Sequence, residues 1–315
     1  KGTFHMGNIE ASYDIDTLNL ITLSFGGYFF NTATTSMQNI TMTDKSGLLL
    51  YQYNEIGRNP KYQYFDFNGK IDYQHLTHRK GEALTFSYLL STTNQENSSS
   101  VSYEDKINFP LSYDSLSNRS NLNFYEHTFQ FDWTRPFAQK HKVEMGLKYI
   151  LRQNFSKTLY EYNNGVNDNT HFNHITNIGA AYAEYSFNSK KWGARAGLRY
   201  ELAHLRGRYP NSDKPSFSSY IPDLVPTLSL SYNINDANTL KLNYATRINR
   251  PGISYLNPAV STSPTTISYG NPNLESTRRN SFRLSHSIMK RKIILNTSLN
   301  YAWANNSLMS LEWVK

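Results

Sequence analysis

Apolar and polar residues alternate along most of this chain, and no other feature limits its fold as strongly. In 142–152, Val, Met, Leu, Tyr and Leu alternate with Lys, Glu, Gly, Lys and Arg, and 192–201 repeats the pattern. Alternation with period two places the two sets on opposite faces of a β-strand. No segment has the apolar spacing of an amphipathic helix, so the sequence predicts an all-β protein.

The alternating segments are long for the strands of a soluble protein. Many have ten or more residues, whereas a strand of a globular protein has about 5–6 and a tilted strand that crosses a bilayer needs about 9–11. Strand length therefore favours an antiparallel transmembrane β-barrel. About twelve strands are predicted, near 4–14, 18–30, 62–75, 83–91, 122–135, 142–152, 174–187, 192–202, 224–234, 238–246, 279–288 and 293–304.

The links between these segments alternate between short and long. Outer-membrane barrels have short periplasmic turns and long extracellular loops. The long links are predicted at 31–61, 92–121, 153–173, 203–223 and 247–278. The polar stretch 94–100, Asn-Gln-Glu-Asn-Ser-Ser-Ser, is then a solvated surface loop. Periodicity alone does not tell inside from outside, so a soluble β-sandwich that binds carbohydrate remains an alternative.

In a barrel, the apolar set faces lipid and the polar set faces an aqueous lumen. Aromatic residues near the strand ends fit interfacial girdles, although they could equally be ordinary strand formers at the edge of a core. The girdle candidates are Trp133, Trp192, Tyr149, Tyr200, Tyr232 and Trp303. The predicted lumen face includes Lys70, Lys148, Arg152, Arg195, Arg199, Glu201, Lys241 and Arg283.

Composition argues against several classes of function. The net charge is +8 over 315 residues, and apart from the cluster at 290–292 the Lys and Arg residues form no basic patch in the sequence, so nucleic-acid binding is not expected. There is no Cys, which excludes disulfides and a thiol nucleophile. The spacing His-x-Ser, which would place both side chains on one face of a strand as in a barrel hydrolase, occurs on no predicted strand, so we expect no enzyme and no cofactor.

Two short motifs could suggest metal binding, but each has a simpler interpretation. His171 and His174 lack an evident third ligand and are predicted to be solvated loop residues. Asp14 and Asp16 lack the rest of a calcium loop. Because Asp stabilises turns through its own side chain, this pair predicts a tight turn, and no metal site is expected.

The even number of predicted strands has a further consequence. If the short turns are periplasmic, the first strand runs inward and the twelfth runs outward, which places both ends of the chain on the extracellular side. A complete barrel begins and ends in the periplasm. We therefore expect residues 1–315 to form one part of a larger barrel.

Two motifs carry a resemblance to a known family. Arg-Ile-Asn-Arg-Pro at 247–251 leads to Leu-Asn-Pro at 256–258 and then to Gly-Asn-Pro-Asn-Leu at 270–274. In this order they resemble the outer-membrane β-barrel family of TonB-dependent receptors from Bacteroidota, over about 180–304. The resemblance implies a barrel of about 22 strands in the Gram-negative outer membrane, filled by a plug domain through which the TonB complex supplies energy. Neither plug nor TonB box is found in this chain.

The loop that carries these motifs is the candidate substrate site. Its X-Pro steps favour extended and turn conformations, so the loop should be ordered. Candidate substrate-binding residues are Arg247, Arg250, Tyr255 and Asn257. The two arginines could bind a carboxylate or phosphate, or they could pair with acidic plug residues and hold the loop, and the holding role is favoured.

Tyrosines in the other long links leave two interpretations open. They could stack on sugars or clamp a peptide, or they could pack the loops against one another. These residues are Tyr51, Tyr53, Tyr103, Tyr113, Tyr160, Tyr162 and Tyr209. The leading hypothesis is uptake of a scarce nutrient, such as a metal chelate, glycan or peptide. The alternative is a plug-free outer-membrane pore or adhesin.

Overall fold

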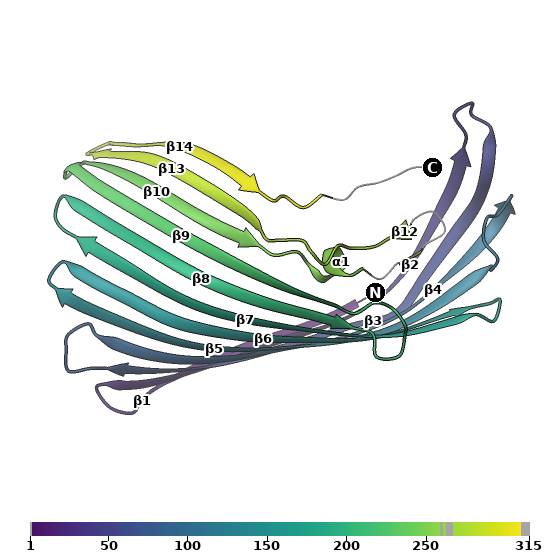
Figure 1. Ribbon diagram of the computed structural model, residues 1–315, viewed down its shortest axis with the longest axis horizontal. Helices are drawn as coiled ribbons and strands as arrows, with labels where there is room; N and C mark the ends of the chain where they lie inside the picture. Colours follow the sequence, from purple (N-terminus) through teal and green to yellow (C-terminus); the bar gives the residue numbers. More distant parts are fainter. Residues whose placement is uncertain (1, 259–260, 263–266, 310–315) are drawn as a thin grey trace.

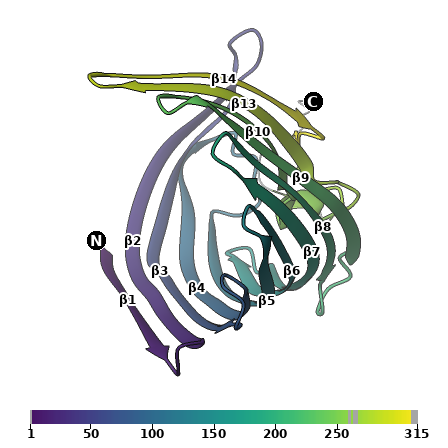
Figure 2. The same cartoon turned by 90° about the vertical axis from the view of Figure 1, so that its left-hand side faces the viewer.

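The chain folds into one long, curved antiparallel sheet. The computed structural model describes residues 2–258, 261–262 and 267–309. Over these ranges twelve strands follow one another in chain order across a single sheet, and two strands of two residues each form a separate hairpin. The sheet curves into a trough with β1 and β14 at its two open edges (Figures 1 and 2). The prediction of an all-β chain with twelve strands is confirmed.

The strand bounds show how far each element extends. The sheet consists of β1 (Gly2–Asp14), β2 (Asn19–Thr43), β3 (Leu49–Leu76), β4 (Ala83–Ile107), β5 (Ser115–Ala138), β6 (His141–Tyr162), β7 (Asn167–Asn188), β8 (Trp192–Arg208), β9 (Phe217–Asn235), β10 (Asn238–Asn249), β13 (Thr277–Lys290) and β14 (Ile293–Asn305). Between β10 and β13 lie the helix α1 (Ile253–Leu256) and the hairpin strands β11 (Ser261–Thr262) and β12 (Ile267–Ser268). No helix in the described part of the chain is long and apolar enough to cross a membrane.

Most of the predicted long loops are strand instead. The links predicted at 31–61, 92–121, 153–173 and 203–223 consist largely of the far ends of β2 to β9. The prediction that 94–100 is a loop is wrong, because these residues lie within β4 and pair with β3 and β5. Asn94, for example, donates from its amide to Asn123 across the β4–β5 pair at 2.8 Å.

The reason for this error is physical. A strand that is exposed to water on both faces needs no apolar side chains. Its main-chain hydrogen bonds do not depend on side-chain type. Period-two alternation therefore stops where the strands leave the apolar environment, although pairing continues. Part of the fifth predicted loop, 259–260 and 263–266, lies outside the described residues.

The six links predicted to be short lie at one edge of the sheet, on the left in Figure 1, whereas other short links, such as 44–48 and 163–166, join the far ends of the strands. In the turn between β1 and β2, Asp16 Oδ1 accepts hydrogen bonds from the main-chain N–H groups of Leu18 at 2.7 Å and Asn19 at 2.9 Å. These hydrogen bonds lower the pKa of the Asp16 carboxyl, with the one from Leu18 contributing most. The interpretation of this motif as a turn is confirmed.

Strand register separates the two faces of the sheet. Lys70 pairs with Leu89, and the same row continues through Thr128, Ile150 and Ile178. Side chains two residues apart share a face, so all eight residues predicted for the lumen lie on this face, which we call the concave face. The opposite, convex face carries many exposed large apolar side chains.

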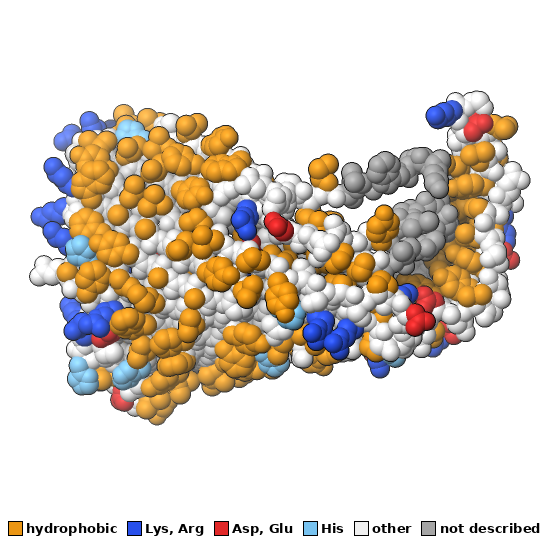
Figure 3. All heavy atoms as spheres, in the orientation of Figure 1, with side chains coloured by type: hydrophobic (Ala, Val, Ile, Leu, Met, Phe, Trp, Pro, Cys, Tyr) orange, Lys and Arg blue, Asp and Glu red, His pale blue; other side chains and the backbone are white. Residues whose placement is uncertain are grey.

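Hydrophobic side chains spread widely over the face seen in Figure 3, whereas Lys and Arg gather at the turn edge on the left. Two girdle candidates lie close to that edge and pack together, since the rings of Trp192 and Tyr232 are 4.4 Å apart. A third, Trp133, donates from its indole N–H to Glu82 in the turn between β3 and β4, at 3.1 Å. These three positions fit an aromatic girdle at the turn side.

Candidate functional site

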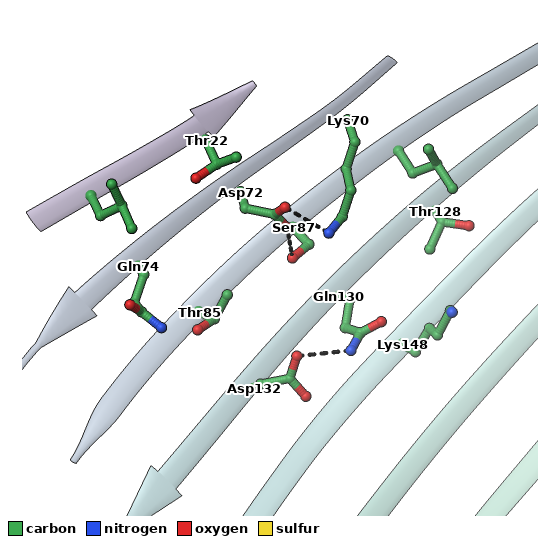
Figure 4. Close-up of a pocket in the computed structure, with 12 residues that line it drawn as sticks. Thr22, Lys70, Asp72, Gln74, Thr85, Ser87, Thr128, Gln130, Asp132 and Lys148 are labelled. Carbon is green, nitrogen blue, oxygen red and sulfur yellow. Dashed lines mark hydrogen bonds and ion pairs between the residues drawn. The ribbon is translucent and has the colours of Figure 1, made fainter. Parts of the chain in front are cut away.

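A polar pocket of about 440 Å³ lies on the concave face of β2 to β6 (Figure 4). Lys70 Nζ is 2.6 Å from Asp72 Oδ2. Gln130 donates to Asp132 at 2.8 Å, and Lys148 lines the same pocket from β6. The pocket therefore offers cations, carboxylates and amides within one water-accessible volume, as the wall of an aqueous lumen should.

Ion pairs continue across the concave face from β5 to β8. Each pair joins neighbouring strands or two positions on one strand, so the charges hold one another in place. The pairs are Arg152 with Glu126, Lys142 with Glu144, Arg195 with Glu184 and Arg199 with Glu201. Paired charges cover this part of the face without a strong net charge.

An apolar patch interrupts the polar face on β7 to β9. Ile178, Ala203, Leu205 and Ile221 point to the same side as the ion pairs but are at most 5% exposed. Leu256 of α1 covers them and is itself fully buried. In the segment 250–276, which we call the inner segment, the described residues 250–258 and 270–276 therefore fold onto the concave face.

Arg250 is the first residue of the inner segment, and its side chain binds the segment to the sheet. Its guanidinium pairs with Glu201 of β8 and lies 3.3 Å from Asp223 Oδ2 of β9. Asp223 is fully buried and also accepts a hydrogen bond from Ser276 Oγ at 2.9 Å. Arg278 Nε lies 3.7 Å from the other carboxylate oxygen of Asp223. Both ends of the inner segment are thus fixed to one buried carboxylate.

Further hydrogen bonds join the two described ends of the inner segment to each other and to the residue that follows β8. Asn257 donates from its side-chain amide to the Tyr209 hydroxyl at 2.5 Å. The main-chain N–H of Gly270 donates to the Asn257 carbonyl at 2.6 Å, and that of Asn271 donates to the Tyr255 carbonyl at 2.6 Å. A Cβ on Gly270 would lie 2.4 Å from the Tyr255 carbonyl oxygen. The Leu-Asn-Pro and Gly-Asn-Pro motifs are therefore held side by side.

The four candidate substrate residues fall into two groups. Arg250 and Asn257 are occupied in holding the inner segment, and the acidic partners of Arg250 belong to this chain's own strands and not to a plug domain. Arg247 is exposed near the end of β10, and Tyr255 is 47% exposed. Among the four, Arg247 and Tyr255 are accessible from the lumen side.

Sequence reasoning missed the residues that Arg250 and Ser276 contact on the sheet. Asp223 and Ser276 were not singled out, and Glu201 was placed on the lumen face without a partner. Asp223 is the last residue of the predicted long link 203–223, where a carboxylate is expected to be solvated. The sequence therefore gives no signal that Asp223 is buried and needs a charged partner.

The loop tyrosines pack against one another. Tyr53 and Tyr103 are buried, with ring centroids 5.4 Å apart, and Tyr113 lies 6.0 Å from Tyr103 and 4.8 Å from Tyr162. This cluster joins the far ends of β3 to β6. For these four tyrosines the structure favours loop packing over stacking on a ligand.

The metal candidates do not form a site. His171 and His174 occupy odd and even positions of β7 and therefore point to opposite faces of the sheet. In the described ranges no group of three or more His, Cys, Asp or Glu could hold a metal ion.

Comparison with known proteins identifies the family. Residues 75–312 match the model of the outer membrane protein beta-barrel family. The chain belongs to this family. Its location is therefore the outer membrane of a Gram-negative cell. No curated protein has a significantly similar sequence.

Solved structures similar to this family member share its fold at low sequence identity. The unliganded ferric citrate transporter FecA aligns with a TM-score of 0.60 and 11% identity over 96% of this chain and 52% of that one. The ferric-catecholate import receptor Fiu from E. coli K12 has a TM-score of 0.60, 10% identity and coverage of 95% and 56%.

A third structure, the siderophore receptor PiuA from Acinetobacter baumannii, has a TM-score of 0.56, 11% identity and coverage of 96% and 56%. The chain thus spans about half the length of these three structures. At this identity the likeness shows the fold: twelve antiparallel strands in one open sheet that match part of the 22-strand barrels of TonB-dependent receptors.

Proposed function

We propose that this chain is part of the barrel of a TonB-dependent receptor that takes up a scarce nutrient. The observation that carries the proposal is the concave face, which has a polar pocket, a band of ion pairs and a firmly held inner segment. An exposed apolar convex face lies opposite. Similar barrels of known structure are described as transporters or receptors of iron chelates, which supports the same class of role here.

The sheet would form one part of a closed barrel. Its edge strands β1 and β14 do not pair with each other in the described residues, and unpaired edges are costly in lipid. Further strands would close the barrel, and a plug domain would fill it and connect it to the TonB complex. The Bacteroidota origin that the motifs indicate stays a prediction.

Substrate would meet exposed groups at the end of β10 and on the inner segment. Arg247 offers a guanidinium for carboxylate or phosphate, and Tyr255 of α1 offers an exposed ring. Arg250 and Asn257 would keep the segment in place. The nutrient would be a metal chelate, glycan or peptide, and no chemical reaction is proposed for this chain.

Growth on a limiting nutrient tests the proposal. The host gene is deleted, and growth is measured on ferric chelates, glycans or peptides as the scarce source. The gene should restore growth on one of these classes, and deletion of TonB should abolish that growth. Uptake that continues without TonB, or a permanently open conductance in planar bilayers, would contradict the proposal and favour the plug-free pore.

Arg247→Glu tests the candidate substrate contact. The reversed charge should weaken binding of an anionic nutrient while the amount of protein in the outer membrane stays unchanged. Arg283→Glu is the matched control, because Arg283 is exposed on the same face but lies away from the inner segment. Equal loss of uptake in both variants would remove Arg247 from the site.

A further inference from the structure

A second pocket, of about 510 Å³, lies on the convex face at the far ends of β3 to β7. Its lining includes Lys61, Arg119, Lys157 and His171. Arg119 occupies the same face of β5 as Tyr125 and Phe129, and Lys157 occupies the same face of β6 as Tyr149. The pocket is therefore continuous with the apolar surface and lies outside the lumen.

The pocket begins where the apolar surface ends. On β5 the outward residues run from Phe129 and Tyr125 to Asn123, Asn121 and Arg119, going away from the short turns. On β6 Phe155 is the neighbour of Lys157 on the same face, and its ring lies 6.5 Å from that of Tyr125. The strands extend much further beyond the apolar surface on the pocket's side than on the side of the 15–18 turn. Because the longer side of an outer-membrane barrel is extracellular, the pocket lies at the level of the outer-leaflet headgroups.

The charges that line this pocket are unbalanced. Lys61 pairs with Glu96, the sole acidic residue in the lining, at 2.5 Å. In the described part of the chain the structure gives no hydrogen bond or ion pair for the side chains of Arg119 and Lys157, and both are exposed. The concave face differs, since its cations from Lys70 to Arg199 are largely paired with carboxylates.

We propose that this pocket binds the phosphate groups of an outer-leaflet glycolipid. A planar guanidinium binds phosphate through two parallel hydrogen bonds, and an ammonium adds a second charge. The acyl chains of the same lipid would lie on the apolar surface below, where Phe155 and Tyr125 form the boundary. Such a lipid would contact both the cationic pocket, through its phosphates, and the adjacent apolar surface, through its acyl chains.

The lysines and arginines at the short turns give the control. Lys190 and Lys191 lie between β7 and β8 and are equally cationic, but they line neither described pocket and lie at the opposite membrane surface. Removing two charges there changes the net charge of the protein by the same amount as removing two charges from the pocket.

The experiment measures the glycolipid that remains bound to the protein purified from outer membranes in detergent. Arg119→Gln with Lys157→Gln is compared with Lys190→Gln with Lys191→Gln, and native mass spectrometry counts bound lipid. A cation near an anionic surface changes affinity about fivefold, so the pocket variant should bind about thirtyfold more weakly. The conservative pair Arg119→Lys with Lys157→Arg should retain most binding and shows that the strands still fold.

Two additional arms test the chemistry of the ligand. Glycolipid from which the phosphates have been removed should compete poorly for the pocket, and inorganic phosphate at equal phosphate concentration should not displace the intact lipid. Unchanged lipid retention in the pocket variant, equal loss in the turn variant, or displacement by inorganic phosphate would each overturn the proposal. None of these outcomes depends on nutrient uptake, so the proposed transport function is tested separately.

Discussion

The concave face differs between two halves of the sheet. On β3 to β6 it is open and polar, with Lys70 and Asp72 in a water-accessible pocket. On β7 to β9 it contains buried apolar side chains such as Ile178 and Ile221, covered by the inner segment. Strands with the same alternation thus carry polar residues where the lumen is open and apolar residues where the chain itself covers them.

This difference indicates that the covered half contains the contacts that contribute most to stability. The open half depends on strand pairing and exposed ion pairs, which are individually weak. The covered half combines burial of apolar surface with a buried carboxylate shared by two arginines. We therefore expect substitutions in the covered half to release the inner segment, whereas similar substitutions in the open half should have small effects.

Arg250→Gln should have the largest effect. It removes the charge that pairs with Glu201 and lies beside the buried Asp223. Loss of one partner from a buried ion pair costs about 3–5 kcal/mol. Hydrogen exchange of the amides in 250–276 should accelerate strongly, while exchange in β3 to β6 stays unchanged.

Arg152→Gln is the matched control in the open half, because Arg152 of β6 is 42% exposed and pairs with Glu126 of β5 on the same face. Its effect should be below about 1 kcal/mol. Equal effects of the two substitutions would show that the inner segment does not depend on Arg250, and the distinction between the two halves would fail.

Leu256→Ala should have the next largest effect. Leu256 is fully buried against the apolar patch on β7 to β9, and truncation of a buried Leu costs about 2–5 kcal/mol. Limited proteolysis should cut the inner segment faster, with the barrel strands still protected. Leu224→Ala is the control, since Leu224 is 49% exposed on the convex face. If only Leu224→Ala accelerated cleavage, Leu256 would not be the residue that holds the inner segment against the apolar patch.

Sequence predicts the fold of this chain well because a barrel strand is a local pattern. The apolar residues of 142–152 must face lipid and the alternating charges must face water, and both requirements are visible in the sequence. The near ends of the strands follow equally well, since Asp16 and the other turn residues act over a few positions. The polar far ends, such as 94–100, leave no such pattern.

The candidate site was predicted only in part, because its contacts are distant in sequence. The motifs at 247–251 and 270–274 indicate an ordered segment, but they do not show what Arg250 binds. Its partners Glu201 and Asp223 lie 49 and 27 residues away, and only strand register places them beneath it. Burial of Leu256 against Ala203 likewise depends on the three-dimensional path of the segment.

Gly270→Ala should have an intermediate effect. The new methyl group would lie 2.4 Å from the Tyr255 carbonyl oxygen, a main-chain atom that cannot move without the rest of the inner segment. Overpacking of this kind costs about 1–3 kcal/mol. Gly252→Ala is the control, because its nearest contact would be 3.8 Å from a Tyr255 ring atom. Amide exchange of 253–257 should accelerate in the first variant, and no difference between the two would contradict the close packing.

Asp16→Ala should have the smallest effect and should leave the inner segment unchanged. The Asp16 carboxylate accepts hydrogen bonds from Leu18 and Asn19, which lower its pKa in the folded chain. In an unfolded chain the pKa of Asp is about 3.9. The carboxylate therefore stabilises the β1–β2 turn fully above this pH, and its contribution is lost as the pH falls through the lower pKa of the folded state.

The variant should accordingly show faster amide exchange at 15–19 at neutral pH, after correction for the intrinsic rate. The difference from the unsubstituted chain should shrink as the pH falls below about 4. Asp14→Ala controls for loss of a nearby negative charge, since the Asp14 carboxylate makes neither of these two hydrogen bonds. If Asp16→Ala also released 250–276, a turn between β1 and β2 would control a segment held by β8 and β9, and the covered half would then depend on distant strands of the sheet.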